Sequence, residues 1–140
     1  MKLKVKKLHP DAKIPNYAHV GDAGMDLYCV DDFSLAPGER KSIPTGIALE
    51  IPLGHVGLVW DKSGLSHKYG LKTLGGVIDS IYRGEVCIGL TNLSSTEFKF
   101  EKGHKIAQIL FQKVEHLEVE EVAELGHTER GTGGFGSTGK

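Results

Sequence analysis

The 140-residue sequence predicts a single all-β domain, a sandwich or barrel, that ends in a glycine-rich arm. Three observations support this fold class. Apolar and polar residues alternate over short stretches, nineteen glycines and five prolines separate those stretches, and no useful length has helical periodicity. We place the domain at residues 1–125 and the arm at residues 126–140, with no linker and no internal repeat.

The expected elements follow from alternating or β-branched residues bounded by turn residues. Strands are predicted around Leu3 and Val5 and at residues 47–51, 56–60, 77–78, 86–90, 98–100, 106–111 and 117–122. Residues 63–69 are the exception. They predict one or two turns of helix with Ser63 as the N-cap.

Composition narrows the function classes. A formal net charge of −1 removes the main electrostatic argument for a nucleic-acid binder. We expect neither a membrane span nor a secretory signal, because the basic residues 1–7 precede no apolar run. The two cysteines, Cys29 and Cys87, indicate reduced thiols in a cytoplasmic protein. Seven scattered histidines lack the close pairing of a zinc site.

Four interior segments combine polar residues with glycines and are not typical of core strands: residues 23–28, 61–65, 75–85 and 103–108. The third predicts a β-hairpin, in which Val77 and Ile78 enter a turn at Asp79 and Ser80 and residues 86–90 leave it. Its flanking glycines would let the backbone lie against a flat ligand such as a pyrimidine edge.

Two side chains of this predicted hairpin are candidates for chemistry. Asp79 could activate a water as a general base, or it could serve only as a turn residue, the commoner role of Asp. Tyr82 could pack on a sugar ring.

The other segments supply weaker candidates. Lys62-Ser63-Gly64 offers a cation, a hydroxyl and an unhindered amide, which suit a phosphate, although such triplets are common. Gln108 is either a ligand contact or a satisfied core residue, and Lys105 is expected to be a solvated charge. Asp26 could fix a basic neighbour, hold the waters of a metal or form an ordinary turn.

The arm from Arg130 to Lys140 has too few apolar residues to form an element of its own. Arg130 and backbone amides suit phosphate, and Phe135 suits stacking on a base, so the arm is either a nucleotide flap or a frayed end. Its glycines imitate the dinucleotide-binding and P-loop motifs. We expect neither, because both need a helix after the motif and the P-loop needs a Ser or Thr after its lysine.

Together these segments resemble, in sequence order, the five short motifs of the homotrimeric dUTPase (dUTP diphosphatase) family. The resemblance extends from Ala23 to Gly139. Its most specific parts are Gly76-Val77-Ile78-Asp79 with Tyr82-Arg83-Gly84, and the arm at residues 130–139.

The resemblance implies a jelly-roll-like subunit, a homotrimer, and three active sites between subunits that hydrolyse dUTP to dUMP and diphosphate. The reaction would lower dUTP and supply dUMP for thymidylate synthesis. Mg²⁺ would be the cofactor, held by substrate phosphates and waters, possibly with Asp26, and by no direct protein ligand.

The resemblance also implies roles for individual residues. Asp79 would be the catalytic base, and Tyr82 would pack on deoxyribose. Asp26 and Lys105 would support the site. The substrate-binding residues would be Lys62, Ser63, Gly64 and Gln108 at the phosphates, Gly76, Val77 and Ile78 at uracil, and Arg130, Phe135 and Gly136 in the arm.

The sequence departs from the family pattern at two motifs. Lys62-Ser63-Gly64 replaces the usual Arg-Ser-Gly, and Gly103-His104-Lys105 replaces Gly-Asp-Arg. Both changes exchange a planar guanidinium for a compact ammonium, so we expect activity with altered phosphate affinity and a rearranged pairing among motifs. Two alternatives remain at this point: a dCTP deaminase of the same superfamily, and a catalytically weak nucleotide-binding regulator on this fold.

Overall fold

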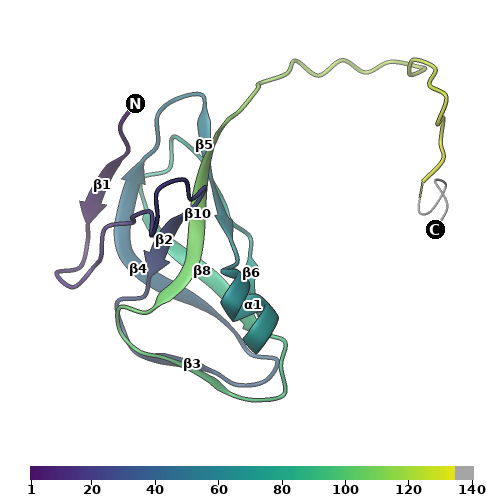
Figure 1. Ribbon diagram of the computed structural model, residues 1–140. Helices are drawn as coiled ribbons and strands as arrows, with labels where there is room; N and C mark the ends of the chain where they lie inside the picture. Colours follow the sequence, from purple (N-terminus) through teal and green to yellow (C-terminus); the bar gives the residue numbers. More distant parts are fainter. Residues whose placement is uncertain (135–140) are drawn as a thin grey trace.

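The computed structural model describes residues 1–134, which form a mostly β domain with one short helix and confirm the predicted fold class (Figure 1). One antiparallel sheet has the strand order β1 (Lys4–Lys7), β4 (Arg40–Glu50), β8 (Glu85–Asn92) and β6 (Leu71–Leu74). The second has the order β2 (Met25–Tyr28), β10 (Lys105–Lys113), β5 (His55–Trp60) and β7 (Val77–Ile78). A two-stranded ribbon pairs β3 (Phe33–Leu35) with β9 (Phe98–Phe100), and α1 covers Ser63–Tyr69.

The period-two pattern of the strands builds a single core shared by the two sheets. Val86, Ile88 and Leu90 point inward from β8, while Ile106 and Ile109 enter the same apolar cluster from β10. Alternation of this kind buries one face of each sheet and leaves the other for side chains that carry function.

A bulge in β4 fixes the start of β8. The register between these strands shifts between Pro44 and Ala48, and Gly46 within the shift has a φ of 67°. A Cβ at Gly46 would lie 2.7 Å from the Val30 side chain, so glycine is required. Its amide donates to Glu85 Oε1 at 2.7 Å, which ties the first residue of β8 to the bulge.

Three local predictions were wrong. Residues 77–90 are not a two-stranded hairpin, because β7 pairs with β5 whereas β8 pairs with β4 and β6 in the other sheet. Lys62, not Ser63, is the N-cap of α1, and no side chain caps the helix. Residues 117–122 form no strand within this chain. Strands β2, β3 and β6 were missed, whereas the other predicted strands and the helix are confirmed.

Candidate functional site

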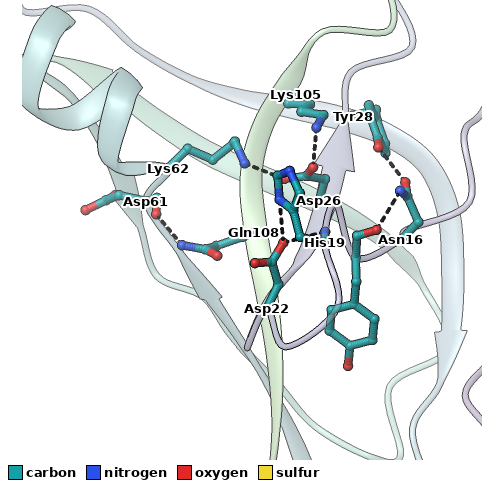
Figure 2. Close-up of polar contacts among 10 residues, drawn as sticks. Asn16, His19, Asp22, Asp26, Tyr28, Asp61, Lys62, Lys105 and Gln108 are labelled. Carbon is teal, nitrogen blue, oxygen red and sulfur yellow. Dashed lines mark hydrogen bonds and ion pairs between the residues drawn. The ribbon is translucent and has the colours of Figure 1, made fainter.

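A buried carboxylate shared by two lysines joins three of the predicted segments (Figure 2). Asp26 on β2 accepts a hydrogen bond from Lys62, and Lys105 Nζ lies 2.6 Å from Asp26 Oδ2. Asp26 therefore does fix basic neighbours, one of the roles left open by the sequence. The expectation that Lys105 is only a solvated charge is wrong, because Asp26 is within ion-pair distance.

Opposing effects act on the charge of this triad. Burial raises the pKa of Asp26, but the ion pair with Lys105 and the hydrogen bond from Lys62 outweigh burial and hold that pKa below its ordinary value. The same ion pair with Asp26 raises the pKa of Lys105. The carboxylate of Asp26 and the ammonium of Lys105 therefore stay charged near neutral pH. By formal charge, two lysines and one aspartate give the triad one net positive charge.

Gln108 lies beside this triad and binds protein backbone. It faces Asp26 on β2 and Trp60 on β5, and its Nε2 donates to the Asp61 carbonyl oxygen at 2.9 Å (Figure 2). A Cβ at Gly24 would lie 2.4 Å from Gln108 Oε1, so the glycine of the first segment makes room for this side chain.

The predicted phosphate-binding triplet opens onto a cavity of about 380 Å³. Asp61, Ser63 and Gln108 contribute to its wall, and Trp60 and His67 complete part of the lining. The triplet spans the end of β5 and the first turn of α1, with Lys62 directed at Asp26 and Ser63 exposed. Of the triplet, Ser63 lines this opening, while Lys62 and Gly64 adjoin it in the chain. A hydroxyl at the start of a helix can bind an anion.

A second cavity, of about 240 Å³, lies at the turn after β7. Its lining consists of Val77, Ile78, Asp79, Tyr82, Glu85 and Cys87. The predicted turn is confirmed, since the Tyr82 amide donates to the Asp79 carbonyl at 3.0 Å. The Tyr82 hydroxyl donates to the Glu85 carbonyl at 3.0 Å, and Asp79 is exposed to solvent.

Two glycines of this segment are needed for close packing within the chain. Gly76 has a φ of 114°, and a Cβ there would lie 2.9 Å from the Val59 carbonyl oxygen of β5. A Cβ at Gly84 would lie 2.3 Å from the Tyr82 hydroxyl. The backbone approach expected at the first of these glycines therefore occurs against β5.

The described part of the arm lies apart from both cavities. After β10 the chain runs away from the sheets (Figure 1), and residues 115–134 are exposed. Arg130 Nε donates to the Gly133 carbonyl at 2.7 Å in a local turn. Phe135 and Gly136 lie outside the described residues.

The structure thus brings together Asp26, Lys62, Lys105 and Gln108, and separately gathers Val77, Ile78, Asp79 and Tyr82. Sequence reasoning missed Asp61, which accepts hydrogen bonds from Thr73 and Lys72 on β6. No sequence signal pointed to this pairing, because β6 itself was not predicted.

Residues 1–134 lack two kinds of feature. Within them, no cluster of three or more His, Cys, Asp or Glu side chains could hold a metal ion. Likewise, no described helix is long and apolar enough to cross a membrane.

Comparison with known proteins gives consistent similarities in sequence. The dUTPase family model matches residues 10–139. The deoxyuridine 5'-triphosphate nucleotidohydrolase of Clostridioides difficile is 50% identical over 139 residues, which cover 98% of this chain and 97% of that protein. The nucleotidohydrolase of the same name from Nautilia profundicola is 48% identical over 142 residues, covering 100% of both chains.

Solved structures agree. The dUTPase of Staphylococcus bacteriophage 80alpha with dUpNHpp superimposes with a TM-score of 0.94 at 31% identity, covering 99% of each chain. A mutant dUTPase from phage phi11 of S. aureus, described as coordinating a structural Mg(II) ion, has a TM-score of 0.83 at 27% identity. That match covers 89% of this chain and 98% of the phage protein.

Proposed function

The chain belongs to the dUTPase family, and on that premise we propose how its residues hydrolyse dUTP to dUMP and diphosphate. Such a reaction needs charge neutralisation at the phosphates, in-line geometry and a positioned base, and it needs no covalent intermediate. The two residue groups described above divide these tasks between them.

The turn after β7 recognises the nucleoside and activates water. Backbone groups of Gly76, Val77 and Ile78 read the uracil edge, while Tyr82 packs on deoxyribose and leaves no room for a 2′-hydroxyl. Asp79 accepts the proton of the water that attacks the α-phosphate. Its solvent exposure and its place on the wall of the 240 Å³ cavity support this role.

The segment from Lys62 to Gly64 binds the phosphates. Lys62 supplies positive charge, and Ser63 and the Gly64 amide donate hydrogen bonds. The net positive charge of the triad with Asp26 and Lys105 supports this assignment. Arg130 and Phe135 of the arm close over the γ-phosphate and the base.

The cofactor implied for this reaction is Mg²⁺, which the substrate phosphates would hold. The described residues fit an ion held by substrate phosphates and waters, since Asp26 is already engaged by two ammonium groups and these residues include no three-ligand cluster. When bound, Mg²⁺ would neutralise phosphate charge.

The active protein is a homotrimer whose sites combine residues of several chains. This proposal is supported by the distribution of the residues within one chain. The 240 Å³ cavity with Asp79 and the 380 Å³ cavity with Ser63 share no lining residue, and the described part of the arm lines neither of them. Leu53, Val77 and Ile81 are also left exposed as large apolar side chains, typical of a surface covered by a partner. The free thiols of Cys29 and Cys87 support a reducing compartment, and we propose the cytoplasm.

A panel of deoxynucleoside triphosphates with Mg²⁺ tests this function. Diphosphate release should be confined to dUTP, and a chain ending at Glu129 should be much slower because it lacks the closing arm. Ammonia release from dCTP would instead indicate a deaminase. Full-rate turnover by the shortened chain would show that the arm is only a tail.

A further inference from the structure

Asp61 connects the two sheets at the end of β5. Its Oδ1 accepts hydrogen bonds from the amide and the hydroxyl of Thr73, each at 2.7 Å, and Lys72 Nζ lies 2.7 Å from Oδ2. Thr73 and Lys72 belong to β6, whereas Asp61 follows a strand of the other sheet. The Asp61 backbone is held as well, because its carbonyl accepts the Gln108 amide.

These contacts are more than an ordinary surface aspartate makes. Burial raises the pKa of Asp61, but hydrogen bonds from Lys72 and Thr73 outweigh it and lower the pKa. Thr73 is itself buried and has both of its donors on one carboxylate oxygen. Each of these bonds fixes the direction in which the chain leaves β5.

The first residues of α1 have few polar contacts that hold their main chain. The helix has seven residues, no side-chain N-cap and no fully buried residue; Leu65 packs against the core while only partly buried, and Tyr69 packs against Phe98. Its C-terminal end is held at Gly70, whose carbonyl accepts the Leu93 amide. At its N-terminal end, Lys62 reaches Asp26 through a flexible side chain, so the main-chain position there depends on Asp61.

We propose that Asp61 is a positioning residue that fixes Lys62, Ser63 and Gly64 for phosphate binding. This inference rests on the function proposed above. Asp61 contributes to the wall of the 380 Å³ cavity, but its carboxylate oxygens are engaged by Thr73 and Lys72, so it acts through the segment that follows it. Gln108 donates a hydrogen bond to the Asp61 carbonyl and helps to fix the same segment.

Three variants remove increasing numbers of the interactions that the Asp61 carboxylate makes. Thr73→Val removes one hydrogen bond, Asp61→Asn retains an acceptor for Thr73 but loses the charge facing Lys72, and Asp61→Ala removes all three bonds. Glu39→Ala is the matched control, since Glu39 also accepts a backbone amide and pairs with a lysine but lines none of the cavities described.

The readout is the ratio of two affinities measured by calorimetry, for dUpNHpp with Mg²⁺ and for dUMP, together with Tm. Because losing a hydrogen bond to a charged phosphate costs about 10-fold to 100-fold in affinity, the ratio of the dUpNHpp affinity to the dUMP affinity should fall by about 10-fold to 100-fold in Asp61→Ala and by less in the other two variants. Affinity for dUMP should change little, and Glu39→Ala should lower only Tm.

A ratio equal to that of the unmodified protein in Asp61→Asn and Thr73→Val, with Tm lowered, would overturn the proposal and leave Asp61 a brace of the fold. These two milder variants decide the matter if Asp61→Ala does not fold. Because both ligands are bound and not turned over, the result is separate from whether the protein releases diphosphate from dUTP.

Discussion

At Asp26, two ammonium groups share one buried carboxylate, and this arrangement determines how the residue responds to pH. Its folded-state pKa lies below the value expected in the unfolded chain, about 3.9, so the carboxylate stabilises the fold above that pH. The stabilisation is lost as pH falls through the lowered pKa. The raised pKa of Lys105 keeps its ammonium charged throughout this range.

Asp26→Asn should therefore lower stability at pH 7 because two lysines would then face each other without a carboxylate. Buried pairs cost about 3–5 kcal/mol to break and exposed pairs about 0–1, and here both lysines are partly exposed. We expect a loss of about 1–3 kcal/mol in denaturant unfolding. The difference from the unmodified protein should shrink below about pH 4, and a difference independent of pH would contradict this account.

Lys62 offers a second test at this scale. Lys62→Arg would place a planar fork beside Asp26 and the phosphates, whereas lysine supplies a compact charge. We expect KM for dUTP to change, by as much as about tenfold, while turnover persists. Steady-state kinetics with Lys4→Arg as a control, an exposed lysine paired with Glu50, would measure this. An unchanged KM and kcat would show that the choice between lysine and arginine at position 62 does not affect phosphate binding.

At the scale of elements, the turn between β7 and β8 depends on close packing of the Tyr82 side chain against Gly84, where a larger residue would not fit. The Tyr82 ring lies where a Cβ at Gly84 would be, and its hydroxyl is held by Glu85, which the β4 bulge holds in turn. The position of the ring is thus set by an element of the other sheet.

Gly84→Ala should displace the Tyr82 ring without unfolding the domain, because the ring is exposed and can swing outward. If Tyr82 excludes the 2′-hydroxyl, discrimination between dUTP and UTP should fall by about 10-fold or more, since a site loses specificity when a steric contact is removed. The ratio of kcat/KM for the two nucleotides measures it. Tyr82→Phe keeps the ring and should retain most of the discrimination. A wild-type ratio in Gly84→Ala would argue against the role of Tyr82.

The same turn shows how far the sequence can predict this structure. Val77, Ile78 and the turn at Asp79 were predictable from local pattern, but their pairing was not, because β7 and β8 join different sheets. The packing that requires glycine at positions 24 and 76 could not be predicted from local sequence. The groups that a Cβ would meet there belong to Gln108 and Val59, which are distant in the sequence. The order of the motifs predicted the candidate residues. The role of Asp61 was not predicted, because its partners Lys72 and Thr73 lie on β6, a strand that the sequence pattern did not indicate.

At the scale of the whole molecule, one chain holds the parts of a site without assembling them. The described arm extends away from the two sheets (Figure 1), and apolar side chains at Leu117, Val119 and Leu125 are exposed along the segment that leads to it. In the homotrimer proposed above, another copy would cover these apolar groups and could pair with residues 117–122, which form no strand within the described chain.

In the homotrimer proposed above, Asp79 and the closing arm of each site come from different chains. Two defective proteins test it: Asp79→Asn with an intact arm, and a chain ending at Glu129 with Asp79 intact. Each alone should turn over dUTP slowly, and Asp79→Asn should still bind dUpNHpp.

Unfolding an equal mixture of the two and refolding it together is the most direct measurement. If the two parts come from different chains, half of the sites have an intact base and half of those receive an arm. Diphosphate release should then recover to about one quarter of the rate of the unmodified protein. If base and arm belong to the same chain, no site in the mixture is complete, and a rate no higher than that of the separate proteins would contradict the claim.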